Sequence, residues 1–131
     1  MKRVIKSGCL ILMLFLSSQR YAQRLPEAGS ELERSRMALT ELESEFGNNS
    51  ARLVPALMEM ADLYHGEGRF SDAYRVLDRA TQVVRVSEGL YTRSQIPLVR
   101  MKVENYADWS DWGSAREQLE HLFWLHRMKS G

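Results

Sequence analysis

The sequence predicts an all-α fold, a short right-handed solenoid of about two and a half helix-turn-helix repeats with five helices. An internal repeat at a spacing of 42 residues aligns Tyr64 with Tyr106 and Ala73 with Ala115. Apolar residues recur every three or four positions, and no stretch alternates with the period of two that a strand requires. Further pairs in the same register are Val54 with Ile96, Leu57 with Val99, Phe70 with Trp112, and Leu77 with Leu119.

The first 22 residues have the pattern of a secretory signal peptide. Three cations precede an apolar run over residues 9–16, which is too short to cross a bilayer of about 30 Å hydrocarbon thickness. Ala22 suits the position before the cleaved bond, and cleavage after Ser18 is the alternative. We therefore expect an exported chain with no membrane span after cleavage.

The exported part is expected to consist of an N-terminal tail over residues 23–29 and a helical domain over residues 30–131. Four of the eighteen Lys and Arg residues lie in the signal, which leaves fourteen against seventeen Asp and Glu. A nucleic-acid-binding surface needs a basic face, so nucleic acid is not an expected partner. The only cysteine, Cys9, also lies in the signal, so an apolar core must hold the domain without a disulfide.

Two helices are predicted before the first long turn, over residues 30–46 and 50–65. Ser30 is expected to cap the first, and the run Gly47-Asn48-Asn49-Ser50 to end it, because Gly and Asn accept the left-handed conformation. Apolar spacing puts these side chains on the inward faces: Leu32, Leu39, Leu42 and Phe46, then Leu53, Leu57, Met60, Ala61 and Tyr64.

Three further helices are predicted, over residues 71–85, 95–107 and 113–128. Ser71 is the expected cap of the first of these, and Pro97 is tolerated in the first turn of the second. Shifted by 42 residues, the helix over residues 30–46 aligns with the helix over residues 71–85, which is the second helix of its repeat. The helix over residues 30–46 is therefore expected to be the second half of a leading repeat whose first half is missing from the pattern.

Residues 54–85 resemble the tetratricopeptide repeat family. The seven matching positions are Leu57, Ala61, Tyr64, Gly68, Phe70, Ala73 and Ala80. Small residues let helix axes approach to about 8 to 10 Å, and aromatics fill the wedge between them. Residues 96–127 match less closely, with Val103, Ser110 and Leu122 at positions where the family has small residues or glycine. Residues 87–97 also resemble exported tetratricopeptide proteins of Gram-negative bacteria, which favours the periplasm, with secretion as the alternative.

The resemblance implies a concave groove lined by the first helix of each repeat. Its side chains are Met58, Asp62 and His65 from one helix, and Arg100, Glu104 and Asp108 from the other. Such a groove is mixed and net acidic, and would suit a basic or apolar peptide. The alternative is that these are solvated polar residues without a ligand.

No residue pattern argues for an enzyme, a cofactor or a metal. Glu117, His121 and His126 share a helix. The five residues from His121 to His126 rotate about 500° around the helix axis, so the second imidazole points well away from the first. Trp112 holds the structural aromatic position of the repeat and is expected in the core. Trp109 lies at a turn and is a weak candidate for ligand contact.

The helix over residues 113–128 carries more apolar side chains than one buried face can cover. The candidate contact patch is Phe123 and Trp124, and Trp124 is the residue we expect above all to remain uncovered. Two functions remain open. One is an exported adaptor that binds a protein or peptide through the groove or this helix; the other is a structural module that self-associates or belongs to a longer helical array.

Overall fold

The structure is a computed structural model that describes residues 29–128, and over these residues it confirms an all-α fold without strands. The predicted signal over residues 1–22, nearly all of the predicted tail and residues 129–131 lie outside the described residues. The chain divides into two compact units, Met1–Glu31 and Leu32–Gly131, and the packing below is that of the second. The solenoid and its handedness stay predictions.

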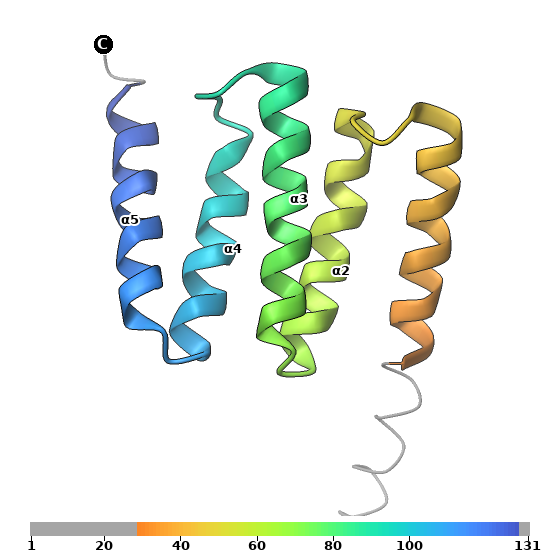
Figure 1. Cartoon of the computed structure of the whole chain (residues 1–131), viewed down its shortest axis with the longest axis horizontal. Helices are drawn as coiled ribbons and strands as arrows, with labels where there is room; N and C mark the ends of the chain where they lie inside the picture. The colour runs from red at the N-terminus through yellow and green to blue at the C-terminus, as the bar shows by residue number, and fades with distance from the viewer. Residues whose placement is uncertain (1–28, 129–131) are drawn as a thin grey trace, which may run out of the picture. The chain divides into compact units, whose positions relative to one another are not determined.

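The described helices follow one another along the chain and run alternately up and down (Figure 1). α3 packs against both α2 and α4, and α4 packs against α5. No described helix combines the length and the apolar character that a membrane crossing requires. The elements are a helix over residues 29–46, the short 3-10 turn η1 (Ala51–Leu53), α2 (Val54–Gly66), α3 (Phe70–Glu88), α4 (Gln95–Asp108) and α5 (Trp112–Arg127).

The helix starts differ from the predicted ones where a serine was expected to act as a cap. Ser50 caps η1 rather than α2, and its hydroxyl accepts from the amide of Arg52 at 3.3 Å. Ser30 is already helical, and Ser71 lies inside α3, which begins without a side-chain cap. Asp111 does cap α5, because its carboxylate accepts from the amide of Ser114 at 3.1 Å.

The α2–α3 and α4–α5 turns use the same left-handed backbone with different residues. Gly68 has a φ of 72°, a conformation that costs glycine nothing. Ser110, 42 residues later, has a φ of 63°. This is the only non-glycine residue with a positive φ among those described, and it carries the strain that the missing glycine predicts.

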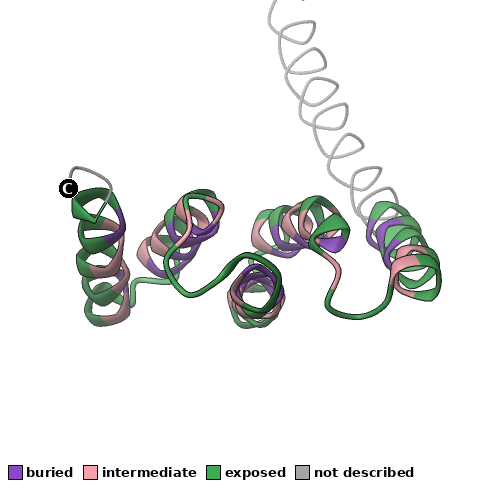
Figure 2. Cartoon of the chain, turned by 90° about the horizontal axis from the view of Figure 1, so that it is seen from above, coloured by how far each residue is buried: buried purple, intermediate pink, exposed green. Residues whose placement is uncertain are grey.

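The core lies where the small residues of the repeat pattern were predicted. Ala61, Ala73 and Ala80 are fully buried, and Leu57 and Tyr64 are buried beside them. Seen from above, buried residues lie on the sides of the helices that face their neighbours (Figure 2). The predicted inward positions of the helix over residues 50–65 are therefore confirmed, whereas Leu42 and Phe46 of the preceding helix are only half-buried.

The expected burial of Trp112 is wrong, since 68% of this residue is exposed. Its counterpart Phe70 is half-buried because Trp109 stacks on it from the end of α4, with ring centroids 6.5 Å apart. Within the described residues no turn lies beyond α5 to give Trp112 such a contact. The same position of the repeat is thus half-buried at Phe70 and exposed at Trp112.

Candidate functional site

α2 and α4 present an acidic face built around a histidine. A small cavity of about 40 Å³ lies between α2, α3 and α4, and Asp62, His65 and Glu104 are among the residues that line it. Asp108 joins them through its contact with His65. We call Asp62, His65, Glu104 and Asp108 the acidic face. Four of the six predicted groove residues are therefore brought together.

The other two predicted groove residues lie apart from this cavity. Met58 is half-buried and packs against the hydrophobic core. Arg100 is exposed on α4 and does not line the cavity. The acidic face therefore has three exposed carboxylates, those of Asp62, Glu104 and Asp108, and no cation of Arg or Lys among its four members.

His65 ties α2 to α4 through both ring nitrogens. Its Nε2 lies 2.8 Å from Oδ2 of Asp108, and its Nδ1 lies 3.2 Å from Oδ1 of Asn105. Asn105 is itself buried, and its side-chain amide donates to the carbonyl of Phe70 at 2.9 Å. One asparagine thus holds the end of α2 and the start of α3 to α4.

Trp109 belongs to a row of rings that joins α2, α3 and α4 rather than to a free platform. His65 meets Phe70 edge-on at 5.4 Å, and Trp109 stacks between Phe70 and Tyr106, 6.4 Å from the latter. Tyr74 continues the row against Tyr106. Nearly half of Trp109 stays exposed, but both of its aromatic contacts are structural. Stacking on Phe70 and Tyr106 is enough to explain the position of Trp109 without a ligand.

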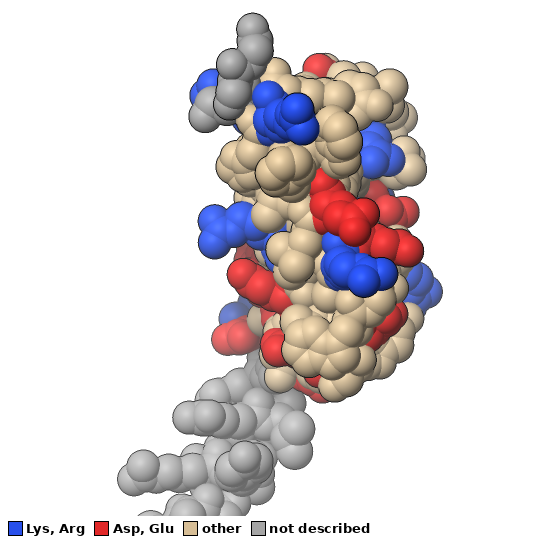
Figure 3. Space-filling view, turned by 90° about the vertical axis from the view of Figure 1, so that its left-hand side faces the viewer, with Lys and Arg blue, Asp and Glu red and all other residues tan. Residues whose placement is uncertain are grey.

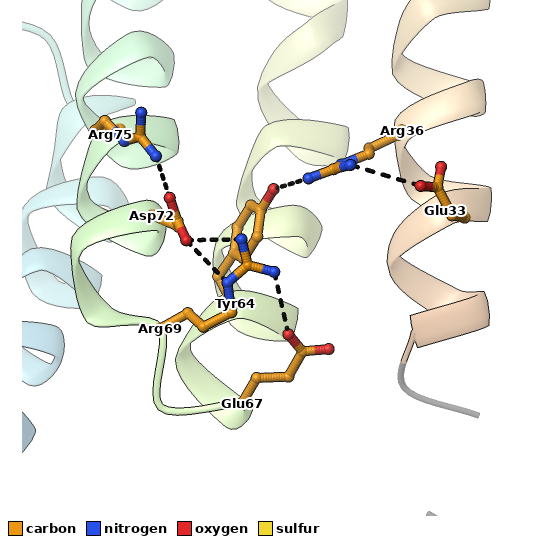
Figure 4. A network of polar contacts seen from close by, with 7 residues as sticks. All are labelled: Glu33, Arg36, Tyr64, Glu67, Arg69, Asp72 and Arg75. Atoms are coloured by element: carbon orange, nitrogen blue, oxygen red, sulfur yellow. Dashed lines mark hydrogen bonds and ion pairs between the residues drawn. The ribbon is translucent and has the colours of Figure 1, made fainter. Parts of the chain in front are cut away.

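A polar network links the helix over residues 29–46 to the α2–α3 hairpin (Figure 4). Arg36 donates to the hydroxyl of Tyr64 at 2.7 Å, which raises the pKa of Arg36. Arg69 lies over the Tyr64 ring and donates to Asp72 at 2.8 Å. Hydrogen bonds from Arg75 and Arg69 lower the pKa of Asp72. These contacts give the network a structural role, because they hold the helix over residues 29–46 against α2 and tie α2 to α3. We call this network the brace.

A cleft of about 300 Å³ lies beside this brace, with Leu39, Leu57 and Tyr64 among the residues that line it. Its volume reaches the lower end of the range for small-molecule sites. Its two arginines are already paired, Arg75 with Asp72 and Arg79 with Glu43. We therefore favour the acidic face as the candidate site.

α5 carries exposed apolar side chains. Figure 3 looks onto the α5 side of the chain, with uncharged residues of every kind in tan. Phe123 is 62% and Trp124 54% exposed, whereas Leu125 is buried and Leu122 is half-buried. The tan surface in this view is bordered by both basic and acidic side chains. Both side chains are exposed as expected, with Phe123 rather than Trp124 the more exposed. A contact role for them stays a prediction.

The three residues considered as metal ligands do not form a cluster. No group of three or more His, Cys, Asp or Glu side chains in the described part of the chain is arranged to hold a metal ion. His121 is half-buried, and burial together with the nearby cations of Arg85 and Lys102 lowers its pKa. The turn between the two histidines explains the separation of His126.

Three residues that sequence reasoning missed connect the helices. Asn105 joins α4 to α2 and α3, and Arg36 joins the first described helix to Tyr64. Lys102 is buried beneath Tyr74 and donates to Asp78 at 3.1 Å, while burial lowers its pKa. The 42-residue register pairs Asn105 with Leu63 and Lys102 with Met60, so no repeat signal marks either position.

A scan of protein-family models finds no match for this chain. A search of curated proteins likewise finds no significant match. The resemblance to tetratricopeptide repeats therefore rests on the residue register and remains a prediction. Any function must be argued from the surfaces of α2, α4 and α5.

Proposed function

We propose that the chain is an exported tetratricopeptide-like scaffold that holds a basic segment of a protein or peptide partner on its acidic face. The segment would lie across α2 and α4, with its Lys or Arg side chains beside Asp62, Glu104 and Asp108. Export is part of the proposal and rests on residues 1–22, whereas the periplasm of a Gram-negative bacterium rests on the resemblance of residues 87–97. No catalytic step is invoked.

One observation carries the proposal: the exposed carboxylates of Asp62 on α2 and Glu104 on α4 line a cavity too small for a ligand, and that of Asp108 contacts His65 in the same lining. Sites for small molecules usually enclose about 300 to 1,000 Å³, whereas the cavity here has about 40 Å³. A surface with fixed charges and no deep pocket suits contact with another macromolecule. Charge complementarity would then contribute specificity and association rate more than affinity.

The buried link through Asn105 supports this reading. Because His65 is held at both nitrogens, the carboxylate of Asp108 is positioned relative to α2 before any partner arrives. Preorganised contacts lose less conformational entropy on binding.

A photo-crosslinking amino acid at position 62 or 104 tests the proposal in the exporting cell. We expect the same crosslinked protein from both positions. Position 86 on α3 is the matched control, since Val86 is also exposed but lies on another helix surface. Equal products from all three positions, or none from positions 62 and 104, would contradict the proposal.

The captured partner then allows a charge test. Asp62→Asn combined with Glu104→Gln should weaken binding by on the order of tenfold, as expected for two charge-assisted contacts of modest strength. Affinity for the unchanged chain should fall as salt rises, because exposed charges are screened beyond about 8 Å at physiological ionic strength. Affinity that is independent of both changes would exclude the acidic face.

A second candidate function is a self-associating structural module. It is favoured by the exposed apolar side chains of α5, which a scaffold with one partner on α2 and α4 does not use.

A further inference from the structure

An ion pair between the helix over residues 29–46 and α3 has a counterpart of different charge between α3 and α5. Glu43 on the first of these helices pairs with Arg79 on α3. Shifted by 42 residues, the same two positions are Arg85 on α3 and His121 on α5. An acid that faces a base in one repeat is thus replaced by two bases in the next. The register therefore predicts that Arg85 and His121 approach each other with no carboxylate between them.

A third base, Lys102 of α4, lies close to Arg85. Its counterpart in the register is Met60, which lines the same cleft as Arg79. Lys102 is 5% exposed, and its ammonium donates to Oδ1 of Asp78 at 3.1 Å. Burial lowers the pKa of Lys102, and the positive charge of Arg85 lowers it further. The apolar position of the first repeat is therefore a buried cation in the second.

His121 completes the set from α5. Burial lowers the pKa of His121, and so do the positive charges of Arg85 and Lys102. His121 therefore lies within electrostatic range of Arg85, as the register predicts. We call Arg85, Lys102 and His121 the basic cluster. Two acids are close to it: Asp78 pairs with Lys102, and Glu117 is exposed one turn before His121.

The basic cluster has a buried donor that the fold does not satisfy. Nε of Arg85 is buried and has no hydrogen-bond partner within residues 29–128. Buried donors are nearly always paired, so an orphaned one calls for an explanation. The ammonium of Lys102 has three N–H groups, of which Asp78 accepts one. Asp78 offsets one positive charge, so the cluster is short of both negative charge and acceptor atoms.

We propose that the basic cluster binds an oxyanion, either a carboxylate or a phosphate group, between α3, α4 and α5. In the bound state Nε of Arg85 donates to one oxygen of the anion, and Lys102 and the protonated ring of His121 donate to the others. Carboxylates and phosphates share the chemistry that this requires, because their charged oxygens accept several charge-assisted hydrogen bonds at once. The anion does for the two bases what the carboxylate of Glu43 does for Arg79.

This site is separate from the acidic face and does not depend on the proposed function. Lys102 and Glu104 are two residues apart on α4, so their side chains leave the helix about 200° apart around its axis. Glu104 lines the cavity shared by α2, α3 and α4. Lys102 instead points to the side where its charge reaches His121 of α5. Loss of either site therefore leaves the other to be tested alone.

The ring resonances of His121, followed by NMR in the purified chain at about pH 6, measure anion binding. We expect a saturable shift as inorganic phosphate replaces chloride at constant ionic strength. The pKa of His121 should also rise in phosphate, because a nearby negative charge favours the imidazolium. Acetate separates the two sources: a response to acetate assigns a carboxylate, and a response to phosphate alone assigns a phosphate group. If neither anion shifts the resonances beyond the effect of chloride, the proposal is overturned.

Arg85→Gln should weaken binding of the responding anion at least about tenfold, the loss expected for one charge-assisted hydrogen bond. Arg100→Gln is the matched control, since it removes the same charge from an exposed position on α4 and should leave the affinity unchanged. Equal affinities in the two variants would contradict the assigned site.

Arg85→Glu decides the matter even if Arg85→Gln folds poorly. It places a carboxylate at the position that Glu43 holds in the first repeat. We expect it to abolish anion binding, to raise the pKa of His121 without added anion, and to melt at no lower a temperature than the unchanged chain. An unchanged pKa of His121 in this variant would show that the two side chains do not interact, and would overturn the proposal.

Discussion

Replacement of Asn105 by alanine should destabilise the fold more than replacement of any member of the acidic face. Asn105 is 1% exposed and makes two hydrogen bonds, to the carbonyl of Phe70 and to the ring of His65. Hydrogen bonds contribute about 0.5 to 1.5 kcal/mol each to stability, so the loss should be about 1 to 3 kcal/mol. For a domain of this size, each kcal/mol shifts the melting temperature by about 4 to 8 °C.

The measurement is thermal and urea unfolding followed by far-ultraviolet circular dichroism. A fall in melting temperature of about 8 to 16 °C corresponds to the middle of the expected range. Asp108→Asn is the control, because that side chain is mostly exposed and surface ion pairs contribute about 0 to 1 kcal/mol. An Asn105→Ala variant as stable as the Asp108→Asn variant would refute the role of Asn105 as the link between α4 and the α2–α3 hairpin.

A double-mutant cycle separates the two bonds. Combining Asn105→Ala with His65→Ala should give a coupling energy of about 0.5 to 1.5 kcal/mol if the His65 contact contributes to stability. A coupling energy near zero would assign the whole effect to the bond with the Phe70 carbonyl.

Two other predictions concern the core and the pH dependence of stability. Ala73→Leu should cost about 1 to 3 kcal/mol by overpacking, and Tyr64→Ala about 3 to 5, because both positions are buried; melts that shift by less than a degree would show the repeat register to be wrong. Burial and neighbouring cations lower the pKa of His121 below its unfolded value of 6.5, so unfolding takes up a proton and stability falls as pH drops below about 6.5. His121→Gln should remove that part of the slope in urea titrations at pH 7 and pH 5, and an unchanged slope would contradict the shift.

The fold could be predicted because the same packing contacts are expected in each repeat, and residues of the same size therefore recur at the same positions in the sequence. Alanines at positions 61, 73 and 80 must be small for the helices to approach, and Tyr64 must be large to fill the wedge. These constraints act on side-chain volume, which a single sequence displays directly. Helix starts were less predictable, since Ser50 and Ser71 both have the chemistry of a cap and only one of them acts as one.

The candidate site was only partly predictable because its geometry depends on contacts that occur once. Asn105 bonds to α2 and α3, yet its counterpart in the register is Leu63, so the repeat gives no sign of a polar link. At Trp112 the repeat does give a sign, but the burial that it predicts is wrong. Its residue type matches the core aromatic, and its exposure follows from its place in the last described helix. Sequence periodicity reports which residues suit a position, whereas burial also depends on what lies next to it.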